Sequence, residues 1–580
     1  MGYCLNLELA DKFKKSLISG DVNPDKLNAM TSKERHEFFA GIIGKEDAPK
    51  VNALFESKLL LKNQQKGMLS WAKTITGIKE PIRRDIFATI ERLDKVLNPA
   101  EEKAFLNDLI NKRLGVDVSL DESKTIYELS KQIDDAKAGM NEDGITFKSE
   151  DARFKYGAAK TALNEYVKDL KSSAMKLTKE DFKVNPMKAT GEAISQAAGT
   201  FKSVTSSMDN SAIFRQGWKT LWTHNKDWRK NSVQSFRDIW NSLGGKETLK
   251  SVYADGFSRE NNLNGFYKKA KLAIGVTEEA YPNAIPAKIP FYKKLYNASQ
   301  DAYAGFLYRQ RMDIFDKYID IAKKTGVELT DKELSSIGQM VNSLTGRGTF
   351  GKYEGAGINT VNNIFFSPRL IKSHLDTLGY QVATGAGGSN FVRKEAAKNL
   401  LKIISGTAAV LTVAKLMNPD SVSFDPRSSD FGKIKIKNTR FDVTGGMGSI
   451  VTLASRYMPT KDKGKWGRYS KSSTTGKVTE IGSGKFGALQ GRDVFFNFAE
   501  NKLSPMAALV NHLFVKGADF KGRKPTIKGE ATSLLVPIGI QNLYENAKSP
   551  ESANLLLTTI ADALGISTNT YSKNDFKNKK

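Results

Sequence analysis

The sequence predicts a mainly α-helical, elongated multi-helical protein with a small β-hairpin element near residues 430–445. Apolar residues recur at three- and four-residue spacing along most of the chain, which is the period of an amphipathic helix. Several of these stretches open with a capping signal, such as Thr31 followed three residues later by Glu34. One stretch, Lys433 to Ile436, instead alternates charged and apolar residues with the period of a strand.

Length and charge limit the possible organisation and partners. A chain of 580 residues is too long for one ordinary core, so we expect several packed units. Lys and Arg number 89 against 63 Asp and Glu, and the net charge of +26 favours a polyanionic partner, either nucleic acid or an acidic membrane face. The alternative is a basic surface that only keeps the protein soluble. The single cysteine, Cys4, excludes an intramolecular disulfide and a cysteine zinc site.

Residues 1–180 are expected to form an N-terminal helical domain. Asn98-Pro99 followed by Glu101 is typical of a helix start, and a further helix is expected over about 150–176. Glycines at 20, 44 and 139–144 separate the helical stretches.

Residues 181–275 are expected to form a connector followed by a Trp-rich basic helical segment. Trp218 and Trp222 are four residues apart and therefore share one helix face. With their basic neighbours they suit a membrane interface or stacking on single-stranded bases. The alternative is an aromatic contact in the core.

Residues 276–345 are expected to form a central helical domain after a Pro-rich linker. Pro282, Pro286 and Pro290 recur every four residues, and Thr330 with Glu333 predicts the start of a helix that ends at Leu344.

The next segment, 346–458, is expected to hold a Gly-rich reversal, an apolar helix and the β-hairpin. Gly346 to Gly351 matches G-x-G-x-x-G, but a nucleotide site of this kind needs a preceding strand and here a helix precedes it. The sequence therefore favours a reversal between helices.

Residues 400–417 are the most apolar part of the chain. Eighteen residues span about 27 Å as a helix, close to the hydrocarbon thickness of a bilayer. Lys402 and Lys415 lie near the ends, and twelve uncharged residues separate them, which is the length of a buried core helix. Both interpretations stay open. The candidate membrane-contacting residues are Trp218, Trp222, Leu400, Ile403, Val410, Leu411 and Leu416.

Residues 459–492 are expected to form a basic flexible loop, and residues 493–580 a C-terminal helical module with a basic tail. A flexible, basic, glycine-rich loop is typical of phosphate contacts without base readout, and the alternative is a plain solvated loop. The candidate nucleic-acid-binding residues are Lys461, Lys463, Lys465, Arg468, Lys471 and Lys477.

No set of residues predicts catalysis. The four histidines are far apart in the sequence, and lone carboxylates such as Glu37 and Glu56 are typical of solvated helix faces. We therefore expect no catalytic residues, no metal site and no cofactor.

Three stretches resemble motifs of large tailed-phage proteins. Asn342-Ser-Leu-Thr-Gly-Arg-Gly348 followed by Asn363-Ile-Phe-Phe-Ser-Pro-Arg369 resembles a paired motif, and Asp442-Val-Thr-Gly-Gly446 resembles a turn, whose glycines we expect to close the hairpin. Asn501-Lys-Leu-Ser-Pro505, Gly517-Ala-Asp-Phe-Lys-Gly522 and Pro537-Ile-Gly-Ile-Gln541 resemble a closing module. The resemblance covers about 340–545 and is to virion-associated and polyvalent proteins that travel with phage DNA.

The resemblance implies a bacteriophage internal virion protein, or ejection protein, without enzymatic activity. Such a protein is packaged in the capsid interior or at the portal and delivered with the genome to help form a DNA conduit across the host envelope. The implied partners are phage genomic DNA, portal or other virion proteins, the host inner membrane and further copies of the chain. The alternatives are a DNA-binding cargo or portal-associated structural protein without membrane activity, and a muralytic or nucleotide-dependent enzyme.

Overall fold

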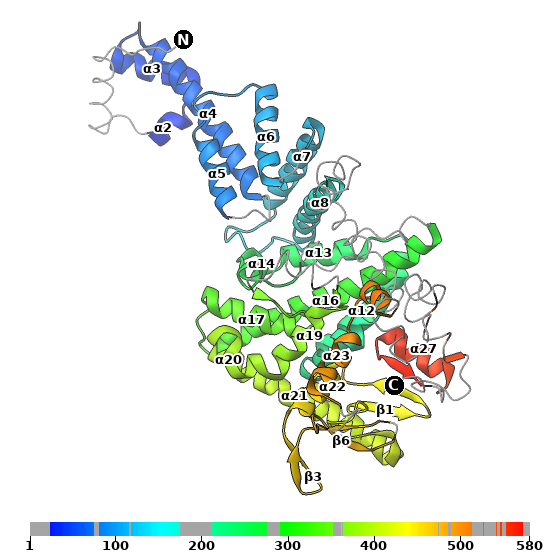
Figure 1. The fold of residues 1–580 in the computed structure, drawn as a ribbon. Coiled ribbons are helices and arrows are strands. Elements are labelled where there is room, and N and C mark those ends of the chain that lie inside the picture. The colour runs from blue at the N-terminus through cyan, green and yellow to red at the C-terminus, as the bar shows by residue number, and fades with distance from the viewer. Residues whose placement is uncertain are drawn as a thin grey trace. The chain divides into compact units, whose positions relative to one another are not determined.

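The fold is that of a computed structural model of the chain (Figure 1). It divides into an N-terminal unit, Met1–Lys176, and a C-terminal unit, Leu177–Lys580. The residues described are 24–74, 80–114, 118–174, 210–274, 290–351, 361, 364–473, 475–484, 489–512, 526, 541, 544, 546–547 and 553–571. Most of the connector expected over 184–211, the Pro-rich linker before Pro290, and the tail from Ser572 lie outside them.

Helix dominates the described part of the chain, with 69% helix and 8% strand, so the predicted mainly α fold is confirmed. The two units meet in sequence at residues 176 and 177, close to the boundary expected at residue 180. The five segments that we expected after residue 180 all belong to the C-terminal unit.

The described part of the N-terminal unit is helical apart from one isolated bridge between Met140 and Phe147. Its helices are α2 (Pro24–Ala29), α3 (Ser32–Ile43), α4 (Ala48–Thr74), α5 (Glu80–Glu91), α6 (Pro99–Leu114), α7 (Leu120–Lys137) and α8 (Glu150–Ala174). The predicted capping box is present, because Thr31 Oγ1 accepts from Glu34 N and the Glu34 carboxylate accepts from Thr31 N at 2.7 Å. The predicted helix start at Asn98 is also confirmed, since Asn98 Oδ1 accepts from Glu101 N at 2.9 Å.

Two glutamines of helix α4 form hydrogen bonds with the loop between α5 and α6. Gln64 donates to the carbonyl of Leu97 at 3.1 Å and accepts from its N–H at 2.9 Å. Gln65 donates to the carbonyl of Leu93 at 2.9 Å. These bonds satisfy backbone groups that a loop cannot pair by itself.

The C-terminal unit contains helices and all seven of the described strands. Its first helices are α11 (Trp218–Thr223), α12 (Asn225–Leu243), α13 (Thr248–Ser258), α14 (Glu260–Leu263), α15 (Phe266–Lys269), α16 (Pro290–Lys324), α17 (Asp331–Leu344), α19 (Pro368–Leu375), α20 (Gln381–Gly388) and α21 (Asn390–Met417). They are followed by α22 (Met447–Tyr457), α23 (Gly491–Glu500), α24 (Pro505–Val510) and α27 (Leu555–Leu564). Three short helical turns lie beside these helices. The turn η1 (Ala212–Gln216) precedes α11, η4 (Asp376–Tyr380) follows α19, and η5 (Pro419–Ser421) follows α21.

The core of this unit is built around α16, which packs against α12, α13 and α17 (Figure 1). Its side chains Tyr308, Phe315 and Ile319 lie in one buried cluster with Ile337 of α17 and Ile403 of α21. Helix α17 begins and ends where the sequence predicts, with Thr330 Oγ1 accepting from Glu333 N at 3.2 Å.

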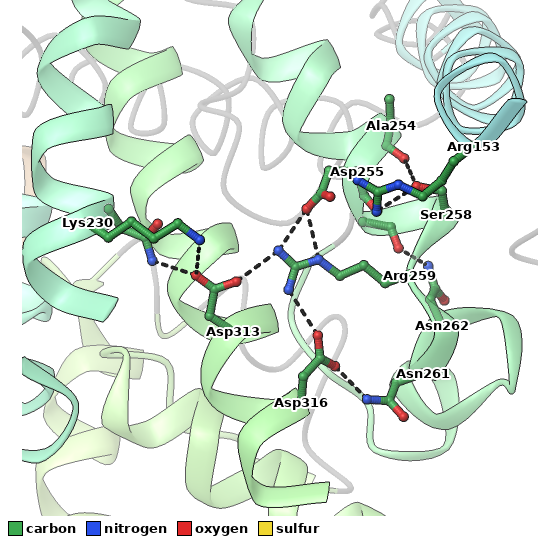
Figure 2. A network of polar contacts seen from close by, with 12 residues as sticks. Arg153, Lys230, Ala254, Asp255, Ser258, Arg259, Asn261, Asn262, Asp313 and Asp316 are labelled. Carbon is green, nitrogen blue, oxygen red and sulfur yellow. Dashed lines mark hydrogen bonds and ion pairs between the residues drawn. The ribbon is translucent and has the colours of Figure 1, made fainter. Parts of the chain in front are cut away.

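A network of ion pairs joins α16 to the helices around it (Figure 2). The guanidinium of Arg259 contacts Asp255 at 2.7 Å, Asp313 at 2.9 Å and Asp316 at 3.0 Å. Asp316 also accepts from Asn261 at 2.8 Å. Arg259 therefore contacts three carboxylates of a tightly packed region, and Lys230 adds a longer contact with Asp313 at 3.8 Å.

The predicted hairpin is confirmed as β1 (Lys433–Ile436) and β2 (Thr439–Asp442), antiparallel and extended by β7 (Thr568–Thr570) in the order β1-β2-β7. The expectation that strand is confined to about 430–445 is wrong. Four more short strands, β3 (Thr460–Asp462), β4 (Lys465–Gly467), β5 (Tyr469–Lys471) and β6 (Val478–Glu480), form two further hairpins.

Candidate functional site

Helix α21 contains the predicted apolar stretch. It has 28 residues, so it is about 42 Å long, and Ser389 caps its start by accepting from Val392 N at 2.9 Å. In the described part of the chain it is the one helix long and apolar enough to cross a membrane.

One narrow face of α21 is buried against the protein. The buried residues on it are Val392, Ala396, Asn399, Ile403 and Leu411. Their spacing follows the helical period, and Asn399 donates to the hydroxyl of Tyr318 at 2.6 Å.

The large apolar side chains of α21 that are exposed, called here the exposed apolar face, are Leu401, Ile404, Val413, Leu416 and, at the end of the helix, Met417. Leu416 is 80% and Met417 83% exposed, and only 11% of the apolar window is buried. A core helix buries most of its apolar surface, whereas α21 buries only the narrow face that joins the core clusters.

The predicted membrane-contacting residues fall on different sides of α21. Leu416 is exposed, Leu400 and Val410 are half-buried, and Ile403 and Leu411 are buried. Sequence reasoning missed Leu401, Ile404, Val413 and Met417. The helical period separates the two faces, but which face is covered depends on helices distant in sequence.

Trp218 is buried and Trp222 is half-buried, and both pack on α21. Trp218 is 4% exposed, and its Nε1 donates to Thr407 Oγ1 of α21 at 3.3 Å. The centroids of the Trp218 and Trp222 rings are 5.3 Å apart in an edge-to-face arrangement. The buried Trp218 is not placed to contact lipid or bases, so its membrane assignment is wrong, whereas Trp222 is half-buried and packs against the core cluster. Among the tryptophans whose side chains the structure describes, Trp240 and Trp466 are exposed.

The indole ring of Trp222 packs directly on Gly406 of α21. A Cβ added there would lie 2.2 Å from the indole ring. Gly406→Ala is expected to lower the free energy of unfolding by about 1–3 kcal/mol, although alanine is the better helix former. Urea unfolding followed by tryptophan fluorescence measures it, since five of the six tryptophans lie in this unit.

The matched control for this prediction is Gly379→Ala in η4 of the same unit, where an added Cβ meets nothing within 4 Å. It is expected to raise stability by about 0.5–1 kcal/mol. An equal gain from Gly406→Ala would contradict the contact between Trp222 and α21.

The segment over 459–492 is not the expected flexible loop. Lys463 and Gly464, with φ of 45° and 86°, form a two-residue turn that closes β3 onto β4, and a second hairpin joins β5 to β6. Composition suggested flexibility, whereas the Lys-Gly pair between short alternating runs was the signal for a hairpin.

The six predicted phosphate-contacting residues are nearly all on the surface. Lys471 is half-buried and lies 3.4 Å from Asp425. The other five, Lys461, Lys463, Lys465, Arg468 and Lys477, are exposed. The hairpins therefore present these cations to solvent on ordered strands and turns.

The paired motif that resembles phage proteins forms an internal joint. The side chain of Asn342 donates to Lys271 O and accepts from Ala273 N, both at 3.0 Å. Gly348 N donates to Arg369 O at 2.9 Å, so the two halves of the motif are hydrogen-bonded. The structure does not describe Asn363.

Lys219 of α11 lies at the centre of this joint and is fully buried. Its Nζ donates to Ser343 O and, at 3.1 Å, to Ser373 Oγ, while Ser343 Oγ donates to Asp376 at 3.0 Å. Burial lowers the pKa of Lys219 to about 7, against a smaller raising effect of Asp376. Because Ser373 has no exposed surface, this cluster stabilises the fold and presents no nucleophile to solvent.

The turn motif joins the same region. The expectation that Gly445 and Gly446 close the hairpin is wrong, because the β1–β2 turn is Lys437-Asn438 and Gly446 precedes α22. The buried imidazole of His374 donates from Nε2 to Gly445 O at 3.1 Å, and burial lowers its pKa.

Gly346 to Gly351 follow helix α17 rather than a strand, as expected, which removes the structural context that a phosphate-binding loop needs. Most of the closing module, including 517–522 and 537–540, lies outside the described residues.

Among the described residues no group of three or more metal-binding side chains lies together. Comparison of the chain with protein-family models, with curated proteins and with solved structures finds no match in any of the three.

Proposed function

We propose that this chain is an internal virion protein of a tailed bacteriophage that acts by contact at the host envelope. It is packaged in the capsid interior or at the portal, leaves with the genome, and helps to form a conduit for DNA across the inner membrane. Its partners in this role are the phage DNA, portal or other virion proteins, and further copies of the chain.

The observation that carries the proposal is the exposed apolar face of α21. A row of leucine, isoleucine, valine and methionine side chains in water is unfavourable, and contact with lipid removes that cost. Lys402 is exposed near one end of the apolar stretch, and half-buried Lys415, which donates to Val422 O at 3.4 Å, lies near the other. The long stem of a lysine lets its ammonium group stay at the interface of a bilayer when the helix inserts. The net charge of +26 draws the protein to acidic lipid and to DNA.

Ala409→Asp tests this proposal at the middle of the apolar stretch. Ala409 is exposed, so the change leaves the folded protein nearly unaffected in water. A carboxylate at the bilayer centre costs about 2.5–3.5 kcal/mol, roughly a 100-fold loss of insertion. Flotation with vesicles that contain phosphatidylglycerol should fall accordingly, and mutant particles should assemble and adsorb but fail to deliver DNA.

The control is Ala104→Asp, which adds the same carboxylate to an exposed position of α6 in the N-terminal unit and should leave flotation and delivery unchanged. If the unaltered protein never floats, or folded Ala409→Asp protein blocks particle assembly, the face packs on another virion protein. The chain is then a DNA-binding cargo or a portal-associated structural protein, which the exposed basic hairpins also suit.

A further inference from the structure

The β3–β4 hairpin extends away from the helices of its own unit (Figure 1). Its register pairs Thr460 with Gly467, Lys461 with Trp466 and Asp462 with Lys465. Residues directly opposite each other share a face, so Lys461 and Trp466 lie on one face and Asp462 and Lys465 on the other. Lys463 stands at the tip, in the turn.

The turn end of the β3–β4 hairpin is fixed in one orientation. Arg427 contacts Asp425 at 2.9 Å and Asp462 at 3.3 Å, which ties β3 to the segment after α21. The hydroxyl of Tyr469, a buried residue, donates to Lys465 O at 3.2 Å. The tip is therefore held by contacts beyond its own short ladder.

The outer surface of the hairpin combines one large aromatic ring with cations. Trp466 is 72% exposed, and Lys461, Lys463 and Lys465 are all exposed. Within the described part of the chain none of these three lysines has an ion-pair partner, and the one carboxylate of the hairpin, Asp462, is taken by Arg427. The free charge of the hairpin is therefore wholly positive.

We propose that the β3–β4 hairpin is an anchor for the headgroup region of an anionic lipid membrane. Trp466 enters the interface, where an amphipathic indole is favoured, and Lys461, Lys463 and Lys465 contact lipid phosphates. The inference rests on the proposed function in that it places the protein at an envelope, but it concerns surface capture rather than insertion of α21.

Neighbouring residues favour lipid over DNA. Met458, just before β3, is exposed, and so is Phe424, beside the Asp425–Arg427 pair that holds Asp462 of β3. Apolar side chains gain from contact with acyl chains and gain nothing from phosphodiesters. A single tryptophan also offers only one ring for base stacking, whereas surfaces that bind single-stranded nucleic acid use several aromatic rings in series.

The test uses the full chain and two kinds of vesicle, pure phosphatidylcholine and phosphatidylcholine mixed with phosphatidylglycerol. The combined change Lys461→Gln, Lys463→Gln and Lys465→Gln should weaken binding to the anionic vesicles by about 100-fold, at about 1 kcal/mol for each lysine. Trp466→Ala should weaken it by roughly tenfold through lost apolar contact.

Two controls match these variants. Lys45→Gln, Lys58→Gln and Lys62→Gln remove the same charge from exposed positions of the N-terminal unit, and Trp240→Ala removes a tryptophan that is 75% exposed on α12. Both should bind anionic vesicles like the unaltered protein. Equal losses in variants and controls would mean that net charge alone drives binding, and would overturn the proposal.

Binding of single-stranded and duplex DNA by the same proteins separates the remaining outcomes. Hairpin variants that lose DNA binding but keep vesicle binding make the hairpin a nucleic-acid contact and overturn the proposal. Hairpin variants that lose vesicle binding while Ala409→Asp has no effect support the hairpin anchor and reject insertion of α21. If Ala409→Asp alone lowers flotation, the anchor is rejected and the proposed function stands.

Discussion

Replacing Arg259 with methionine is expected to lower the free energy of unfolding of the C-terminal unit by about 3–5 kcal/mol. Methionine keeps most of the volume of the side chain but removes the cation that contacts three carboxylates (Figure 2). Asp313 and Asp316 are mostly buried, so their charges lose compensation in a region that water screens poorly. Urea unfolding at neutral pH measures the loss.

The pH dependence of this loss identifies its cause. Burial already raises the pKa of Asp316, and removing Arg259 raises it further. Protonation then relieves the repulsion, so the deficit of Arg259→Met should shrink as pH falls from 7 toward 5. Arg393→Met on the exposed surface of α21 should cost less than about 0.5 kcal/mol at both values. A deficit of Arg259→Met that stays constant with pH would point to lost packing instead.

Local signals were enough to predict the bounds of α17. Thr330, Glu333 and the apolar periodicity up to Leu344 all belong to one short stretch, and the structure places α17 at those bounds. The β1–β2 hairpin was predicted for the same reason, since alternation and a break between the strands are local. The strand β7 was not, because it is separated from β2 by more than 120 residues and joins only through tertiary structure.

The candidate site was harder to predict because it depends on which surfaces meet. A four-residue spacing puts Trp218 and Trp222 on one face but does not say whether that face meets lipid, bases or another helix. The partner is Gly406 of α21, almost 190 residues later, and nothing local links the two. The same contact determines that Ile403 and Leu411 are covered while Leu401 and Ile404 are left in water. Similarly, the Gly-, Ser- and Lys-rich composition of residues 459–492 suggested a flexible loop, and the hairpin turn at Lys463-Gly464 was therefore not predicted.

Lys219 sits on the helix that carries both tryptophans, so its protonation acts on the element that holds α21. An unfolded chain keeps the lysine proton up to a pKa of about 10.5, whereas burial in the folded protein lowers the pKa to about 7. Between these values the unfolded state binds more protons than the folded state, and stability therefore rises with pH. Below pH 7 the folded protein carries the full cost of a buried charge.

Lys219→Met is expected to remove this rise. From pH 7.5 to 9.5 the unaltered protein should gain about 2 kcal/mol more unfolding free energy than the variant, since one proton contributes up to about 1.4 kcal/mol per pH unit. Lys502, whose pKa burial also lowers, acts in the same direction but is present in both proteins. Tyr267 and Tyr318, whose pKa values burial raises above 10, titrate beyond this window. Parallel stability curves for the two proteins would mean that Lys219 keeps its proton, and that its contacts with Ser343 and Ser373 hold a buried ammonium throughout.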